Sequence, residues 1–129
     1  RGPGPCGSPT APHSLAAVVC SAASQRLNVA AMPKDSKESK EPKGIFHWSD
    51  GASITWFDFA LEIQTQALAL GLLKSPCTLR PIPTSEYPTP AARPLYSVMS
   101  RARARAEFDC PTNTWQAELT RCLLASSKV

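Results

Sequence analysis

Between positions 55 and 71 the apolar residues recur every three or four positions, which is the spacing of one face of an α-helix. Thr55 is a suitable N-cap, and Asp58 three residues later completes a variant of the capping box. Ile54 and Phe59 stand at the two positions of a hydrophobic staple, and the glycine at 71 suits the stop position after a helix. We therefore predict a helix that begins at Thr55 and ends just before this glycine.

Weaker patterns predict the elements on either side of this helix. The runs at 45–48, 77–83 and 96–99 are typical of extended segments, and the first indicates a buried strand followed by a turn. A short helix is predicted over 101–108, capped by the serine before it. Asn113, with a glutamine three residues later, resembles a capping box that opens a last helix.

The stretch from Thr84 to Pro94 is rich in proline, which predicts a stiff, largely extended loop instead of a helix. Arg93 lies in this loop, where a guanidinium on a restricted backbone suits bidentate binding of a phosphate or a carboxylate. The alternative is that Arg93 only binds carbonyl groups of the loop. Tyr87 and Tyr96 flank it and offer hydroxyl groups or stacking faces to a ligand, or else pack in the core.

Residues 1–43 have a different composition, rich in proline, serine and alanine and ending in a run of alternating charge. They lack the apolar periodicity that offsets ordering entropy, so we expect a disordered or only locally helical arm, followed by a folded lobe over 44–129. Gly2 to Gly7 matches G-x-G-x-x-G literally, but no strand precedes it and two prolines remove amide donors, so we do not expect a nucleotide fingerprint.

Charge and cysteine usage exclude several classes of protein. Most of the net charge of +4 falls in the arm, so the folded part is near neutral, which argues against nucleic acid as a partner. The five cysteines form no CxxC pair and have no histidine at ligand spacing, which argues against a disulfide framework and a metal site and favours a reducing compartment. The longest apolar run, 15–20, is far shorter than the ~20 residues of a membrane span.

Catalytic patterns are weak. His47 lies in the predicted strand, where a hydrogen-bonded core residue is the more ordinary reading than a general base. Asp58 and Glu62 are one helical turn apart, but capping already accounts for the first of them. A chain of 129 residues is also too short for a complete nucleotide-cofactor oxidoreductase, which needs roughly 250.

Five segments together resemble a known family. They are 44–50 (GIFHWSD), 55–60 (TWFDFA), 69–73 (ALGLL), 83–94 (PTSEYPTPAARP) and 96–98 (YSV). They resemble the C-terminal part of dTDP-4-dehydrorhamnose reductase, an RmlD-like extended short-chain dehydrogenase/reductase, from Gly44 to about Leu124. The resemblance implies a small α+β substrate-binding lobe with about three helices and two or three short strands, with the cofactor-binding Rossmann domain missing.

The family reduces dTDP-4-dehydro-L-rhamnose to dTDP-L-rhamnose with NADPH or NADH, in a step of polysaccharide biosynthesis. The resemblance therefore implies a dTDP-sugar nucleotide as partner, a cytoplasmic and often homodimeric enzyme without a membrane anchor, and magnesium (Mg) as a cofactor in some members. It also makes Arg93, Tyr87 and Thr89 candidates for substrate contacts near the diphosphate or the sugar.

The catalytic parts of that family have no counterpart here. Its tyrosine acts with a lysine four residues later, which lowers the tyrosine pKa, yet Ala91 stands four residues after Tyr87 and Ser100 four after Tyr96. No catalytic or cofactor-binding residue is carried over, so we expect the chain to bind no NADPH or NADH and to be inert alone. The alternative is a non-catalytic binding or interaction module whose basic arm recruits an acidic partner.

Overall fold

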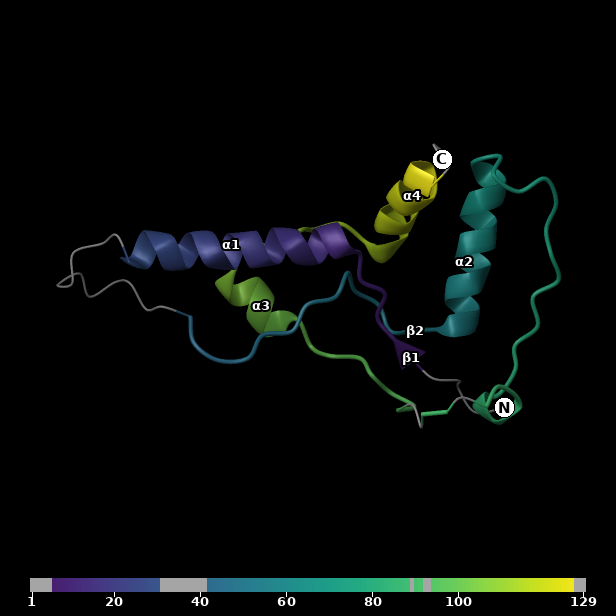
Figure 1. Cartoon of the computed structure of the whole chain (residues 1–129), viewed down its shortest axis with the longest axis horizontal. Coiled ribbons are helices and arrows are strands. Elements are labelled where there is room, and N and C mark those ends of the chain that lie inside the picture. Colours follow the sequence, from purple (N-terminus) through teal and green to yellow (C-terminus); the bar gives the residue numbers. More distant parts are fainter. Residues whose placement is uncertain (1–5, 31–41, 89, 92–93, 127–129) are drawn as a thin grey trace.

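The computed structural model describes residues 6–30, 42–88, 90–91 and 94–126. Within these residues the chain is a small α+β structure (Figure 1). Its elements, in order, are β1 (Cys6–Gly7), α1 (Pro12–Ala30), β2 (Ile54–Thr55), α2 (Trp56–Ala69), the short 3-10 helix η1 (Thr84–Glu86), α3 (Ala102–Glu107) and α4 (Trp115–Ser126). The long helix α1 extends to one side with α3 beneath it, and α2 and α4 lie toward the other side.

Three segments that are far apart in the sequence meet at β1. This strand pairs antiparallel with β2, so that Cys6 lies opposite Thr55. On its other side Cys6 forms a parallel bridge to Tyr96: its amide donates to the carbonyl oxygen of Leu95 at 2.9 Å, and its own carbonyl oxygen accepts from the amide of Ser97 at 3.0 Å. The extended segment expected at 96–99 thus provides the second neighbour of β1.

Helix α2 begins and ends as its sequence predicts. Thr55 Oγ1 accepts from the amide of Asp58 at 3.1 Å, and Asp58 Oδ2 accepts from the amide of Thr55 at 3.0 Å, which completes the capping box. Gly71 has a φ of +71°, and the amide of the next residue donates to the carbonyl oxygen of Ala67 at 2.8 Å. This is the Schellman geometry of a helix end.

We expected residues 1–43 to be disordered or only locally helical, and of these alternatives the structure shows a helix at residues 12–30, the 19-residue α1. Its first turn depends on a distant group: Asp50 Oδ2 accepts from the amide of Ala11 at 2.6 Å, across 39 positions of sequence. Ser14 and Val18, on the helix, are buried against the rest of the molecule. The groups that stabilise α1 therefore come from distant parts of the sequence, and no local apolar pattern predicts them.

The prediction of a buried strand at 45–48 is wrong. These residues are irregular, and the side chain of Ile45 is 76% exposed. His47 is exposed as well, so it is not the core histidine that a buried strand would hold. A strand needs a neighbour to accept its backbone hydrogen bonds, and β1 already has its two neighbours elsewhere.

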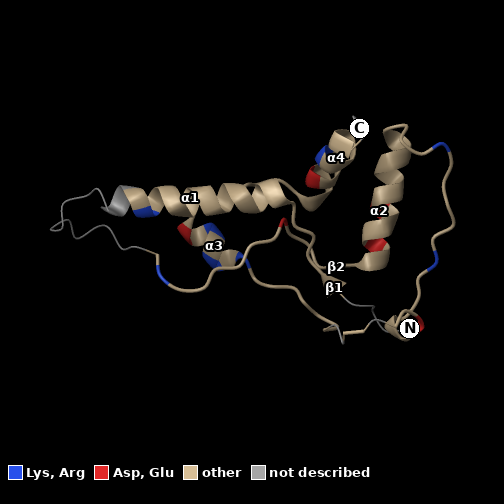
Figure 2. Cartoon of the chain, in the orientation of Figure 1, with Lys and Arg blue, Asp and Glu red and all other residues tan. Residues whose placement is uncertain are grey.

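Arg101, which precedes α3, and Arg103, within it, bind this irregular segment; Figure 2 shows basic residues on α3. The guanidinium of Arg101 donates to the carbonyl oxygen of Ser49 at 3.0 Å and lies 5.8 Å from the ring centre of Trp48. The guanidinium of Arg103 lies 4.6 Å from the ring centre of Phe46 and donates to carbonyl groups of the same segment. These arginines thus stabilise the segment 43–49 through hydrogen bonds to its carbonyl groups and contacts with its aromatic rings.

Smaller differences concern the remaining predictions. The segment 77–83 is irregular, and the proline-rich loop that follows opens with η1; the described residues of the loop beyond η1 belong to no helix or strand. Helix α3 begins one residue later than predicted: Arg101 and not Ser100 is its N-cap, without a side-chain capping bond, and Ser100 Oγ accepts from the amide of Ala102 at 3.4 Å. Helix α4 is capped one residue later than expected, because Thr114 Oγ1 accepts from the amide of Ala117 at 3.3 Å.

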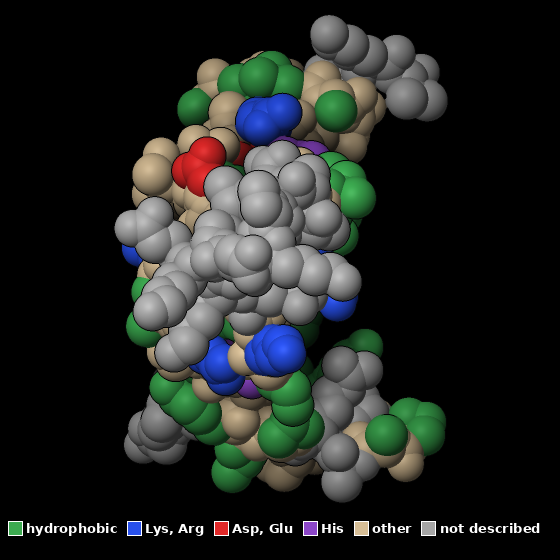
Figure 3. All heavy atoms as spheres, turned by 90° about the vertical axis from the view of Figure 1, so that its left-hand side faces the viewer, with side chains coloured by type: hydrophobic (Ala, Val, Ile, Leu, Met, Phe, Trp, Pro, Cys, Tyr) green, Lys and Arg blue, Asp and Glu red, His purple; other side chains and the backbone are tan. Residues whose placement is uncertain are grey.

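The hydrophobic core is small. Helices α2 and α4 pack together, with the ring centres of Phe59 and Trp115 5.8 Å apart. Many large apolar side chains stay exposed, and Figure 3 shows hydrophobic side chains gathered at both ends of one face. No helix in the described ranges is both long and apolar enough to cross a membrane.

Candidate functional site

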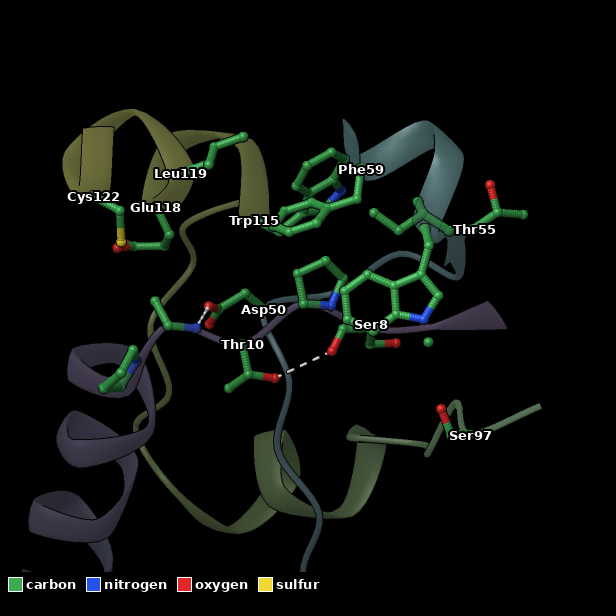
Figure 4. Close-up of a pocket in the computed structure, with 16 residues that line it drawn as sticks. Ser8, Thr10, Asp50, Thr55, Phe59, Ser97, Trp115, Glu118, Leu119 and Cys122 are labelled. Atoms are coloured by element: carbon green, nitrogen blue, oxygen red, sulfur yellow. Dashed lines mark hydrogen bonds between the residues drawn. The ribbon is translucent and has the colours of Figure 1, made fainter. Parts of the chain in front are cut away.

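A pocket of about 470 Å³ lies where β1, α1, α2 and α4 come together (Figure 4). Its lining is drawn from residues 7–12, from 54–59 and from 115–122, with Asp50 and Ser97. The segment 7–12 links β1 to α1 and crosses the pocket, so the part of the chain expected to be a disordered arm forms one of its walls.

Aromatic side chains of α2 and α4 form another wall. The rings of Trp56 and Phe59 are 6.3 Å apart and inclined by 70°, and those of Phe59 and Trp115 are inclined by 57°. Trp115 is only 7% exposed, whereas Trp56 is 68% exposed. Trp56 therefore has an aromatic surface that a ligand can cover, while Trp115 is fixed within the packing.

Asp50 lies at the centre of the lining residues and is 3% exposed. Its Oδ2 atom binds the amide of Ala11 at the start of α1, where the helix dipole favours a negative charge. Its Oδ1 atom is buried without a partner among the described residues, and so is Nε1 of Trp115. The pocket lining thus contains one unused acceptor and one unused donor.

Glu118 is a second buried carboxylate of the lining, with an exposed fraction of 2%. It accepts hydrogen bonds from Nε2 of His13 and from Nδ2 of Asn113, the latter at 2.6 Å, and Arg121 lies 3.5 Å away. Burial by itself raises the pKa of Glu118, but the bonds from Asn113 and His13 and the nearby charges outweigh it and hold the pKa below its ordinary value of 4.5. The pair with His13 joins α1 to α4 beside the pocket.

The pocket residues differ from those that the sequence singled out. Tyr87 follows η1, is 68% exposed and does not line the pocket. Thr89 and Arg93 lie outside the described residues. Sequence reasoning missed Glu118, although it stands three positions after Trp115 and so on the same face of its helix. It also set aside His13, for which no local signal indicates a partner 105 positions away.

The residues present do not fit the pyrophosphate of a nicotinamide dinucleotide. Such a site needs free amide groups at the start of a helix that follows a glycine turn. Here the helix after the Gly2 to Gly7 stretch is α1, and the carboxylate of Asp50 already occupies its N-terminus. The pocket lining also contains no lysine or arginine. Among the described residues no group of three His, Cys, Asp or Glu could hold a metal ion.

Fold and pocket together define a small α+β binding lobe. The family model described as RmlD substrate binding domain matches residues 5–127, and the chain belongs to this family. The expected resemblance is thus confirmed, and it extends further than expected. Residues 7–12, which we placed in an arm unlike the family, lie within the match and line the pocket.

Several curated relatives that the chain resembles are named dTDP-4-dehydrorhamnose reductase. The dTDP-4-dehydrorhamnose reductase of Salmonella typhimurium is 32% identical over 83 residues, which are 64% of this chain and 28% of the relative. That of Escherichia coli is 30% identical over 86 residues, 67% of this chain and 29% of the relative. A probable dTDP-4,6-dihydroxy-2-methyloxan-3-one 4-ketoreductase of Streptomyces antibioticus is 34% identical over 77 residues, which are 59% of this chain and 24% of the relative. The matches span less than a third of the length of these relatives.

Proposed function

We propose that this chain supplies the sugar-nucleotide-binding lobe of a dTDP-4-dehydrorhamnose reductase and does not transfer hydride by itself. The observation that carries the proposal is the family match over 5–127, because it includes every residue that lines the pocket. The relatives are named for reduction of a dTDP-linked keto sugar, which makes dTDP-L-rhamnose and its 4-keto precursor the ligands to test.

The division between binding and catalysis follows from the residues. Asp50, Trp115 and Glu118 of the lining are buried and Trp56 presents an exposed aromatic face, so the pocket can bind and orient a ligand. No tyrosine of this sequence has a lysine four residues later, and the start of α1 is closed to a dinucleotide by Asp50. We propose that other residues of a complete reductase bind NADPH or NADH and supply the catalytic tyrosine and lysine.

Binding is tested by titrating the purified chain with dTDP-L-rhamnose and with dTDP. We expect a saturable change in indole fluorescence, because Trp56 and Trp115 both line the pocket. GDP-mannose serves as a matched control that carries a different base and sugar. A fluorescence signal that stays flat with both dTDP ligands would contradict the proposal.

Inactivity is tested separately, by following NADPH and NADH absorbance with dTDP-4-dehydro-L-rhamnose present. We expect no consumption above the rate without protein, while the full-length Salmonella relative consumes the cofactor under the same conditions. Turnover that scales with the concentration of this chain would overturn the second half of the proposal.

A further inference from the structure

Helix α1 is buried against the rest of the molecule only near its start. The residue before the helix, Ala11, is buried, and so are Ser14 and Val18 in its first turns. Of the side chains described at 19–27, none is buried, and Figure 1 shows the far end of the helix extending away from α2 and α4. Docking of α1 therefore removes little apolar surface from water.

Two buried acidic residues bind the start of this helix. The amide of Asp50 donates to the carbonyl oxygen of Pro9 at 3.2 Å, and Oδ2 of Asp50 accepts from the amide of Ala11 at 2.6 Å. Glu118 of α4 accepts from Nε2 of His13 on the first turn of α1. The docked position of α1 thus depends on a few polar contacts at one end.

The docked helix also leaves polar atoms buried without partners. Oγ of Ser14 and Oδ1 of Asp50 are buried and accept or donate no hydrogen bond among the described residues. Such an atom has lost its hydration without compensation, which raises the free energy of the docked state. Ser14 belongs to α1 and Asp50 binds the residue before it, so movement of α1 away from the lobe lets water reach both.

The packing of α2 on α4 is more extensive. The ring centres of Phe59 and Trp115 lie 5.8 Å apart. One to two turns further along the two helices, Oγ1 of Thr120 donates to Oε1 of Gln66 at 2.7 Å, and Nε2 of Gln66 donates to the carbonyl oxygen of Gln116 at 3.1 Å. Regions with few buried contacts open at a lower free energy than well-packed ones, so α1 should open while α2 stays on α4.

The segment that leads into α1 is a wall of the pocket. Residues 7–12 line the pocket, and the dashed line from Asp50 in Figure 4 marks the bond that holds this wall. The strand before the wall, β1, is paired on both sides, with β2 and with Tyr96, so it is a fixed point about which the wall can turn. Movement of α1 therefore moves the wall and widens the pocket.

We propose that α1 is a hinged gate of the pocket. It leaves the lobe as one unit together with residues 8–11, while β1 and the pair of helices α2 and α4 stay in place. The contacts that Asp50 and Glu118 make with this unit set how often the gate opens. The gate does not depend on the identity of a ligand, so it stands or fails separately from the proposed function.

Native-state hydrogen exchange of the wild-type chain, followed by NMR at a series of low urea concentrations, measures the gate. We expect amides of α1 to open about tenfold or more as often as those of α2, with a weaker dependence on urea, because gate opening exposes less surface than unfolding. The amide of Ala11, which is bound to Asp50, should share the opening free energy of α1, because the wall moves with the helix.

Two variants test which contacts are broken on opening. His13→Ala removes a bond that Glu118 accepts in the docked state only, so amides of α1 should open about tenfold more often. Thr120→Val weakens the contact between α2 and α4, so it should speed exchange in α2 and leave α1 unchanged. His47→Ala is the matched control, because His47 is an exposed histidine outside these contacts, and it should alter neither helix.

Each other outcome overturns the gate. One opening free energy and one urea dependence for α1 and α2 would show a single cooperative unit, as would an equal effect of Thr120→Val on both helices. Exchange of α1 at the rate of an unfolded chain would show that it has no docked state. An amide of Ala11 that keeps the value of α2 would show that the wall stays while the helix opens. The wild-type comparison needs no variant, so it decides the matter even where a variant fails to fold.

Discussion

Glu118 shows how a single residue can join distant parts of this chain. A carboxylate that is 2% exposed is costly unless its oxygens are paired, and here they are paired by His13 and Asn113, with Arg121 nearby. His13 belongs to α1 and Glu118 to α4, so the bond fixes the position of one helix relative to the other. Of this pair, Glu118 lines the pocket.

The pH dependence of stability follows from Glu118. Because its folded-state pKa is lowered, its contribution is fully present above the ordinary value of 4.5 and is lost as the pH falls through the lower folded value. We expect Glu118→Gln to lower the free energy of unfolding at pH 7 by about 1–3 kcal/mol, since a bond to a charged partner is lost. The difference from wild type should shrink as the pH falls below 4.5.

Thermal melts followed by far-UV circular dichroism at pH 7 and at pH 3 measure this difference. Glu107→Gln is the control, because Glu107 is exposed at the end of α3. Equal melting temperatures of wild type and Glu118→Gln at pH 7 would contradict the role of the pair.

At the scale of elements, arginines in and just before α3 bind the irregular segment that precedes β2, and two glycines of that segment let the arginines approach closely. Gly44 and Gly51 have φ values of +117° and +106°, and each lies under a guanidinium. A Cβ atom at Gly51 would come within 2.5 Å of a guanidinium nitrogen of Arg101, and one at Gly44 within 2.8 Å of Arg103. The glycines therefore allow both the turn and the close approach of the arginines.

Gly51→Ala tests whether the close approach of Arg101 to this glycine stabilises the fold. The added methyl group meets an unfavourable φ, and Arg101 must move its guanidinium aside and give up its bond to the carbonyl of Ser49, so we expect a loss of about 2–3 kcal/mol in the free energy of unfolding. Gly71→Ala is the matched control: its φ is also positive, but a Cβ there has no atom within 4 Å, and we expect about 1 kcal/mol from backbone strain alone. Equal losses in urea denaturation would contradict the role of the arginine.

At the scale of the whole molecule, the chain exposes more apolar surface than a stable monomer of this size usually does. The exposed large side chains include those of Leu15, Val19, Leu27, Ile45, Trp56, Ile82, Tyr87, Leu95, Tyr96 and Met99. They are spread over α1, the start of α2 and the long connections, while few apolar residues are buried. Under the proposed function, this is the surface on which the rest of a reductase would pack.

We therefore expect the isolated chain to self-associate and to unfold with weak cooperativity, because apolar surface without a partner favours contacts between copies. Light scattering coupled to size-exclusion chromatography, together with calorimetry, measures both properties. A clean monomer with one sharp transition would contradict this expectation.

The sequence by itself determined the elements whose stabilising groups are close neighbours. The start and end of α2 can be predicted from Thr55, Asp58 and Gly71, because a cap acts within a few residues of its helix. The family could also be predicted from the sequence, because the segments that resemble it, such as 83–94, are each contiguous.

Only the tertiary structure decided α1 and the pocket. Asp50 meets the start of α1 across 39 positions, and His13 meets Glu118 across 105. No periodicity or local propensity encodes such pairings, because they depend on where the chain returns in space and on which carboxylates burial then forces to find a partner.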